Sequence, residues 1–247
     1  MRLRKFLGII AGLSLSSLAS PAFCAPFTNG DFETPTVPSA SFTLFSTAST
    51  SITAWTVVGA TGGNVAIVSG AFQQSDAGVN FIFPAQSGSQ WLDLTGVSNT
   101  LNEGVSQSFD TIAGHQYSVS FYIGNVSDPT GIFGTTSSVI VRANGSTIDT
   151  ATNSSSNPNV SCGQGTCQTL LYQLFTTTFV ASSASTALAF LNNDPSTDTS
   201  NALDNITVTD LGPVSTVPLP AALPLFATGL GALGLLGWRK KRKAIAA

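Results

Sequence analysis

The sequence predicts an all-β protein whose main part is an antiparallel β-sandwich. Short runs that alternate apolar and polar residues recur along the chain, and Gly, Asn, Pro and Asp separate them. Ser, Thr, Asn and Gly fill most polar positions, whereas Val, Ile, Phe and Thr fill most of the others. No apolar stripe with a 3.6-residue period extends beyond two helical turns.

The clearest predicted strand covers residues 116–123, where apolar side chains occupy one face and Ser118, Ser120 and Tyr122 occupy the other. Similar runs predict eight more strands. These lie at 52–58, 64–68, 90–95, 105–110, 138–143, 169–179, 187–192 and 203–209.

Turn signals separate the predicted strands. Asn144-Gly145 is typical of a type I′ hairpin. Residues 153–165, rich in Ser, Asn and Gly, predict an exposed loop, and residues 211–216 predict a short linker. The sandwich is expected to span 26–210, which is long enough for one domain with its own core.

The N-terminus predicts a secretory signal peptide over residues 1–25. Arg2, Arg4 and Lys5 precede an apolar stretch at 6–18, which is too short to span a membrane. Small residues follow, so cleavage is expected after either Ala22 or Cys24.

The C-terminus predicts one transmembrane helix at 219–238. Its apolar residues would cover roughly 30 Å, about one hydrocarbon core. Five basic residues, 239–243, follow at once and are expected to stay in the cytoplasm. The domain would then lie on the other side of the membrane.

The segment 217–247 opens with a short motif rich in proline, Val217-Pro218-Leu219-Pro220-Ala221. Motif, span and basic end together resemble the PEP-CTERM sorting signals of bacteria, in the VPLPA-type version rather than the commoner Val-Pro-Glu-Pro. The resemblance implies an exosortase-type processing enzyme as partner. It also implies delivery to the cell surface or extracellular matrix of a Gram-negative bacterium. The alternative is a plain membrane anchor.

Charge is unevenly distributed along the chain. All Lys and Arg residues except Arg142 lie in the two terminal signals, and all twelve carboxylates lie between Asp31 and Asp210. The exported part therefore carries a formal charge of about −11, which argues against nucleic acid or anionic lipid as partner. Cations and neutral polymers fit better, unless the acidity serves only solubility.

Cys162 and Cys167 flank four residues that can turn back on themselves. We expect them to form a disulfide in an oxidising compartment. The alternative, half of a metal site, lacks a second ligand pair.

A second resemblance concerns the predicted domain and covers most of 28–209. Its motifs are 29–35 (NGDFETP), 55–57 (WTV), 88–94 (GSQWLDL), 104–109 (GVSQSF), 113–121 (AGHQYSVSF) and 203–208 (LDNITV). Their order resembles choice-of-anchor surface proteins and carbohydrate-binding modules. The resemblance implies an antiparallel jelly-roll β-sandwich of the galactose-binding-like type.

The same resemblance implies a structural calcium ion between the first and last strands, on Glu33 and Asp204 with Asn29 and Asp31 as helpers. Calcium prefers several oxygen ligands, carboxylates among them. The alternative is that Asp31 and Asp204 make turn hydrogen bonds.

Sugars are usually held by aromatic faces together with a few polar groups. Trp91 and Asp93 share a face of one predicted strand, and Tyr122 lies on the polar face of another, so these three are the candidate glycan ligands. Trp55 and Tyr172 are further candidates. Large aromatic residues are also the usual content of a core, and that alternative stays open.

No catalytic motif is present in the sequence. His115, the only histidine, falls in a turn signal, which does not favour a catalytic triad. We therefore expect a noncatalytic exported protein that associates with extracellular polysaccharide. A structural matrix protein without a glycan ligand is the alternative, and a polysaccharide-active hydrolase is a weaker one.

Overall fold

The computed structural model describes residues 26–129, 131–156, 159–163 and 165–214. The regular elements among these residues are β-strands, which confirms the all-β prediction. No helix in this part of the chain is long and apolar enough to cross a membrane. The expected signal peptide at 1–25, the sorting motif Val217 to Ala221 and the helix at 219–238 lie outside the described residues.

The described residues contain fifteen strands. They are β1 (Phe42–Ser46), β2 (Thr56–Val58), β3 (Asn64–Ser69), β4 (Gln73–Asp76), β5 (Val79–Ile82), β6 (Gln90–Asp93), β7 (Gly104–Asp110), β8 (His115–Asn125), β9 (Ser137–Ala143), β10 (Ser146–Asn153), β11 (Asn159–Cys162), β12 (Gly165–Thr169), β13 (Leu171–Val180), β14 (Ser185–Asn192) and β15 (Ala202–Pro213).

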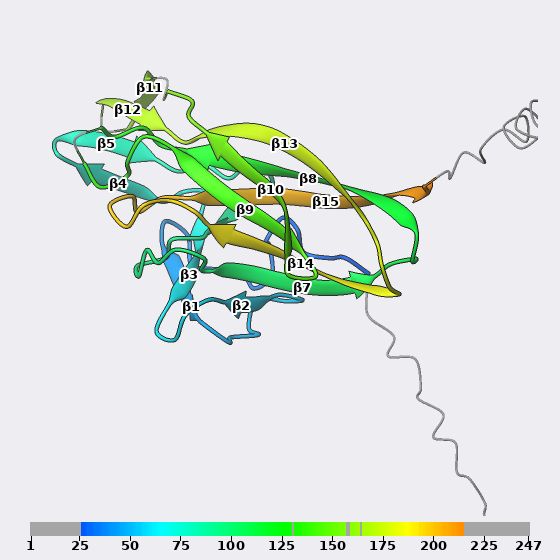
Figure 1. Ribbon diagram of the computed structural model, residues 1–247. Helices are drawn as coiled ribbons and strands as arrows, with labels where there is room; N and C mark the ends of the chain where they lie inside the picture. The colour runs from blue at the N-terminus through cyan, green and yellow to red at the C-terminus, as the bar shows by residue number, and fades with distance from the viewer. Residues whose placement is uncertain (1–25, 130, 157–158, 164, 215–247) are drawn as a thin grey trace, which may run out of the picture.

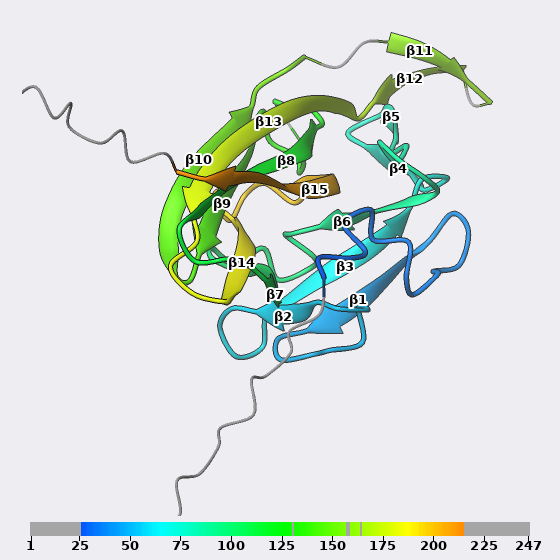
Figure 2. The ribbon, with the colours of Figure 1, turned by 90° about the vertical axis from the view of Figure 1, so that its right-hand side faces the viewer.

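The strands form three sheets (Figures 1 and 2). The main sheet has the order β1-β3-β6-β15-β8-β13, and the second sheet has the order β10-β9-β14-β7-β2. The small sheet, β11-β12-β5-β4, lies at one end of the molecule (Figure 1). Strand pairs are antiparallel except for β12 with β5, so the predicted antiparallel sandwich is confirmed.

The main core lies between the main sheet and the second sheet. The odd-numbered residues Tyr117 to Ile123 of β8 point into it, as their alternation predicted. Trp55 and Phe190 meet there with ring centroids 6.2 Å apart. Removal of these side chains from water is the principal stabilising term for the sandwich.

A smaller core lies on the opposite, outer face of the main sheet. Its residues on the main sheet include Val68 of β3, Trp91 of β6 and Ala202 of β15. These pack against Phe81 of β5 and Phe83, which follows β5 directly. The small sheet therefore covers one end of the outer face. It leaves the neighbouring part of that face open, and a pocket forms at this boundary.

Each predicted strand has a counterpart in the structure, but the prediction at 52–58 was too long. Only Thr56–Val58 forms a strand. Before it the chain turns, because the amide of Trp55 donates to the carbonyl of Ile52 and Ala54 has a positive φ of 67°. Ile52 and Trp55 are both buried, so their apolar pattern reflected burial rather than extended backbone.

The type I′ hairpin is confirmed, since Asn144 and Gly145 between β9 and β10 have φ values of 49° and 81°. The exposed loop expected at 153–165 is wrong in part. Asn153, the last residue of β10, is fully buried, and its side-chain Nδ2 donates to the carbonyls of Ile123 and Leu171 at 2.8 Å each. Strand β11 also lies within the segment expected to be a loop. β15 also continues to Pro213, so the start of the expected linker is strand.

Candidate functional site

The three predicted glycan ligands all lie on the outer face of the main sheet, but only two of them meet. Trp91 and Asp93 are two residues apart on β6, opposite Val68 and Ala66 of β3. Tyr122 on β8 is half-buried opposite Asp204 and Leu174, away from the pocket described next. The structure therefore brings Trp91 and Asp93 together and leaves Tyr122 apart.

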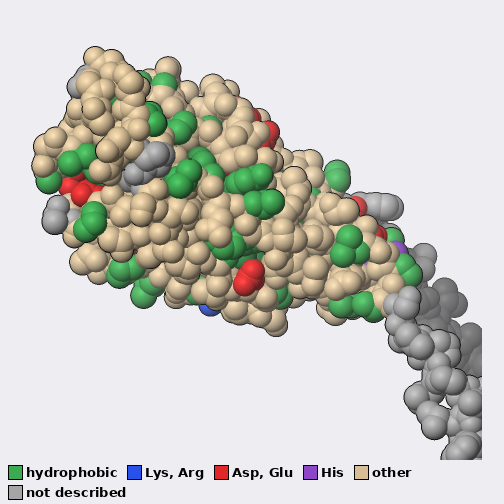
Figure 3. Space-filling view, turned by 90° about the horizontal axis from the view of Figure 1, so that it is seen from above, with side chains coloured by type: hydrophobic (Ala, Val, Ile, Leu, Met, Phe, Trp, Pro, Cys, Tyr) green, Lys and Arg blue, Asp and Glu red, His purple; other side chains and the backbone are tan. Residues whose placement is uncertain are grey.

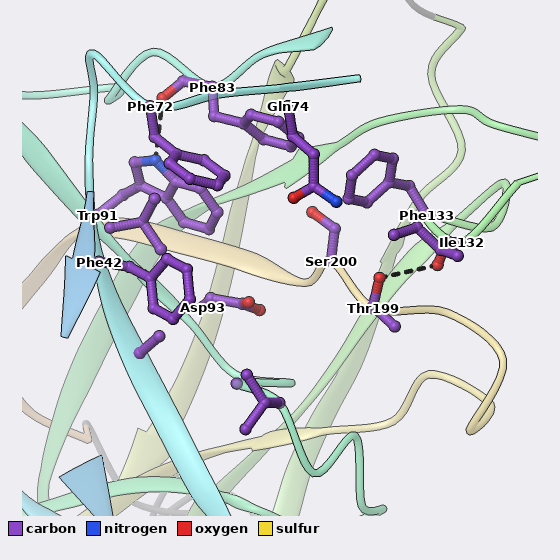
Figure 4. A pocket seen from close by; sticks show the side chains of 14 residues that line it. Phe42, Phe72, Gln74, Phe83, Trp91, Asp93, Ile132, Phe133, Thr199 and Ser200 are labelled. Carbon is purple, nitrogen blue, oxygen red and sulfur yellow. Dashed lines mark hydrogen bonds between the residues drawn. The ribbon is translucent and has the colours of Figure 1, made fainter. Parts of the chain in front are cut away.

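A pocket of about 280 Å³ opens beside Trp91 and Asp93 (Figure 4). It lies between the outer face of the main sheet, the small sheet and three loops. This volume is just below the usual range for ligand pockets, roughly 300–1,000 Å³. Its lining residues are Phe42, Ala66, Val68, Phe72, Gln74, Phe83, Trp91, Asp93, Gly96, Val97, Ile132, Phe133, Thr199 and Ser200.

Aromatic rings form a continuous wall of the pocket. Phe42 contacts Phe72, with ring centroids 5.7 Å apart, and Phe72 contacts Phe83 at 5.6 Å. Phe83 in turn stacks on Trp91 at 6.2 Å and meets Phe133 edge-on at 5.3 Å. Each ring is therefore held by its neighbours, which keeps the wall in place without a ligand.

Trp91 is mainly a core residue, which is the alternative that the sequence left open. Its side chain is 2% exposed, and its indole nitrogen donates to the carbonyl oxygen of Phe83 at 3.0 Å (Figure 4). The ring nevertheless lines the pocket. Trp91 thus supports the wall and contributes little surface to a ligand.

Asp93 places a carboxylate in the pocket (Figure 4). Its Oδ1 accepts hydrogen bonds from the amide of Thr95 at 3.0 Å, the hydroxyl of Thr95 at 2.7 Å and the amide of Asn201 at 3.2 Å. Burial raises the pKa of Asp93 to about 6, so the group remains mostly ionised at neutral pH. All three donors are neutral groups.

Two further buried carboxylates belong to the segment between β14 and β15, and the sequence analysis missed both. Burial, followed by the charge of Asp198, raises the pKa of Asp194 to about 9. Burial raises the pKa of Asp198 to about 8, and the charge of Asp93 adds to it. Asp194 Oδ1 accepts from the amide of Ser138 at 2.6 Å, whereas its buried Oδ2 has no hydrogen-bond partner.

The mouth of the pocket combines apolar side chains with uncharged polar groups. Phe42, Val97 and Ile132 are 41%, 64% and 40% exposed. Ser200 lines the pocket with a buried hydroxyl that has no hydrogen-bond partner, and Figure 4 shows it pointing toward Gln74. A ligand that brings both apolar faces and hydroxyl groups would match this surface.

Three of the four residues expected to bind calcium make direct hydrogen bonds within the chain. Glu33 accepts from the amide and hydroxyl of Ser89 at 2.8 and 2.6 Å, and from the amide of Gln90 at 2.9 Å. Asp204 Oδ2 accepts from the amides of Gln86 and Ser87 at 2.9 and 3.0 Å. Two carboxylates that lie far apart in the sequence thus accept hydrogen bonds from the same segment, residues 86–90.

Asn29, the third member of that set, donates its amide nitrogen to the carbonyls of Thr34 and Thr53 at 2.8 and 2.9 Å. Asp31 is half-buried in the turn that follows. No group of three or more histidine, cysteine or acidic side chains within the described ranges is arranged to hold a metal ion. Because the carboxylates of Glu33 and Asp204 already accept N–H and O–H groups, the arrangement does not by itself indicate calcium, and the calcium site stays a prediction of the sequence.

The remaining predicted residues lie elsewhere. Cys162 and Cys167 form a disulfide that closes the β11–β12 hairpin, as expected. Trp55 is buried in the main core, where its indole nitrogen donates to the carbonyl of Asn29 at 2.9 Å. Tyr172 packs against the smaller core outside the pocket lining. His115 Nδ1 lies 2.9 Å from a carboxylate oxygen of Asp210 at an exposed position outside the pocket.

Comparison with known proteins gives distant structural similarities. A family 35 carbohydrate binding module from an environmental isolate has 16% identity and a TM-score of 0.38, over 60% of this chain and 93% of that chain. The CBM22-1 xylan-binding domain of Paenibacillus barcinonensis Xyn10C has 16% identity and a TM-score of 0.37, over 72% and 99%. The K2 cleaved adhesin domain of Lys-gingipain has 14% identity and a TM-score of 0.39, over 73% and 96%.

These likenesses are too distant to assign a ligand, and no curated protein matches the chain. A family model does match. It is described as "Protein of unknown function (DUF642)" and covers residues 25–209, which is most of the sequence. The chain therefore belongs to the DUF642 family.

Proposed function

We propose that this chain is a noncatalytic, exported cell-surface protein that binds extracellular polysaccharide through the pocket beside Trp91 and Asp93. The observation that carries the proposal is the pocket itself. A preformed aromatic wall faces a small set of polar groups, Asp93, Gln74 and Ser200, which is the usual composition of a sugar site. The galactose-binding-like jelly roll implied by the sequence motifs is the scaffold we propose for it.

Export and sorting form the second part of the proposal. The disulfide between Cys162 and Cys167 fits an oxidising compartment. The sequence patterns at 1–25 and 217–247 support secretion and exosortase-type processing at the surface of a Gram-negative bacterium.

The pocket favours binding over the two alternatives. A hydrolase would need two carboxylates lining one cleft, whereas Asp93 is the acidic residue in this lining. A purely structural matrix protein has no need for a preformed hollow with buried polar atoms in it. Buried polar groups without a partner in the chain cost stability unless a ligand or a water molecule meets them.

The test is binding of the full chain, purified in mild detergent, to the extracellular polysaccharide of the producing organism. Phe42→Ala removes an exposed ring from the mouth and should weaken binding about tenfold. Leu174→Ala is the matched control, because Leu174 is 52% exposed on the same sheet but outside the pocket. Saturable binding that only Phe42→Ala weakens supports the proposal. Absence of binding would favour the structural matrix alternative, and equal loss in both variants would show that the polysaccharide does not bind in this pocket.

A further inference from the structure

The pocket joins two features that together select a kind of ligand. Its wall is made of aromatic rings, whose faces carry partial negative charge and attract a cation within about 6 Å of the ring centre. Its polar side holds the carboxylate of Asp93, which is 7% exposed. A positively charged group in this pocket would therefore be stabilised both by the faces of the aromatic rings and by the carboxylate of Asp93.

No basic side chain of the described residues neutralises Asp93. Its hydrogen bonds come from Thr95 and Asn201, which are uncharged. Arg142, the one Lys or Arg in the described ranges, hydrogen-bonds Asn102 at 3.2 Å, and His115 pairs with Asp210. Since a buried charge without a counter-ion is costly, a neutral ligand that covered Asp93 would add to the cost and a cation would offset it.

The surroundings of the pocket add no positive charge. Burial raises the pKa values of Asp194 and Asp198 to about 9 and about 8, and the charge of Asp93 adds to both, so at pH 7 both are mostly protonated and Asp93 carries the negative charge. The part of the chain between the two terminal signals carries about −11 formal charges and no lysine. On the face shown in Figure 3, acidic side chains outnumber basic ones. Anionic glycans are therefore repelled and cationic ones attracted.

From this geometry we infer that the pocket recognises a sugar ring with a free, protonated amino group, as in a partly deacetylated polysaccharide. The ammonium group pairs with Asp93, and the apolar face of the ring packs on the aromatic wall. The inference rests on the proposed function, and it names the class of glycan that the pocket selects.

The test uses the full chain and three β-1,4-linked hexasaccharides of equal length, built from glucosamine, N-acetylglucosamine or glucose, in titration calorimetry at pH 7. The glucosamine oligomer should bind roughly tenfold more tightly than either neutral oligomer. Asp93→Asn keeps the size and the acceptor oxygen of the side chain, and it should remove this preference. Asp110→Asn is the control, because it removes one charge from an exposed position on β7 outside the pocket.

If Asp93→Asn still prefers the glucosamine oligomer over the neutral oligomers, the preference comes from the overall charge of the protein, and the inference is wrong. Phe42→Ala is a second variant at an exposed position, so it keeps the test valid if Asp93→Asn does not fold. Phe42→Ala should weaken binding of the glucosamine oligomer, and its circular dichroism spectrum should match that of the wild type. Choline provides an ammonium group without a sugar and should bind more weakly. If choline binds as tightly as the glucosamine oligomer, the pocket does not recognise the sugar ring.

Failure of this inference can be told apart from failure of the proposed function. If all three oligomers bind equally and Phe42→Ala weakens them all, the pocket is a sugar site without the amino preference. If none of them binds and the organism's own polysaccharide does not bind either, the proposed function itself fails.

Discussion

The main core and the pocket end of the molecule use similar aromatic side chains for different purposes. In the main core Trp55, Phe121 and Phe190 are fully or almost fully buried, and the indole of Trp55 has a hydrogen-bond partner. At the pocket end, Phe42 and Ile132 remain exposed at the mouth. The core is closed and satisfied, whereas the pocket end leaves apolar surface open to solvent.

The two regions also differ in buried polar atoms. Near the pocket, Asp128 Oδ2, Asp194 Oδ2, Ser200 Oγ and Asn201 Oδ1 are buried without a hydrogen-bond partner. Each such atom costs free energy of folding. This difference indicates that the main core stabilises the fold, whereas the pocket end lowers the stability somewhat because it holds a site.

The largest effect should come from the main core. Trp55→Ala leaves a cavity between the two sheets and should lower the free energy of unfolding by about 3–5 kcal/mol. Urea denaturation followed by circular dichroism measures it. A loss below about 1 kcal/mol would mean that the closed core is not the main source of stability.

The pocket end should respond to pH in a specific direction. The folded-state pKa values of Asp194 and Asp198 are about 9 and about 8, above the unfolded value near 4. Between those values the folded protein binds more protons than the unfolded chain, so the free energy of unfolding should fall as pH rises from 5 to 8. Denaturation curves across that range measure the slope.

Asp194→Asn removes one of these ionisations and should raise the free energy of unfolding at pH 8 by about 1–3 kcal/mol. Asp110→Asn, at an exposed position, is the control and should leave the slope unchanged. Stability that rises with pH in the wild type would show that these carboxylates are not buried as described.

The small sheet should be stabilised modestly by its disulfide. Reduction, or Cys162→Ala, should lower the free energy of unfolding by roughly 2 kcal/mol, because the closed loop is short. Thermal melts with and without reductant measure this, and Cys162→Ala should no longer respond to reductant. A melting temperature that reductant leaves unchanged in the wild type would contradict the contribution.

Phe42→Ala should separate the two regions most cleanly. Since the ring is already 41% exposed, the substitution should lower the free energy of unfolding by only about 1 kcal/mol while it weakens ligand binding. Parallel measurement of melting and polysaccharide binding gives both numbers. A large loss of stability would place Phe42 in the core rather than at the site.

The smallest effect concerns calcium. Because Glu33 and Asp204 already accept backbone hydrogen bonds from segment 86–90, a chelator should leave the melting temperature unchanged. Glu33→Ala should destabilise the protein equally with and without chelator. A drop in melting temperature on chelation would support the calcium hypothesis.

How far the sequence predicts this structure depends on where side-chain burial controls the strands. β8 and β14 line the main core, and their alternating apolar residues made them recognisable. β4 (QQSD) and β11 (NVSC) carry few apolar residues and belong to the small sheet, where backbone pairing with β5 and β12 positions them. Such pairing leaves little trace in a single sequence.

The site was predictable only where it lies within one strand. Trp91 and Asp93 share a face of β6, so alternation identified them together. Phe42, Phe133 and Ser200 come from segments far apart in the chain, and only the folded arrangement of the sheets brings them to one pocket. Asp194 and Asp198 lie in a segment without strand signals, which suggests exposed turns although both are buried.

Glycan binding in the pocket is tested most directly by a structure of the full chain with a fragment of the producing organism's own extracellular polysaccharide. We expect a sugar ring in the pocket between Phe42, Phe133 and Asp93. A second hollow lies on the second sheet, where Asn102, Ser106 and Arg142 are among its lining residues. A fragment bound there instead, or no bound fragment at saturating concentration, would contradict glycan binding in the pocket beside Trp91 and Asp93.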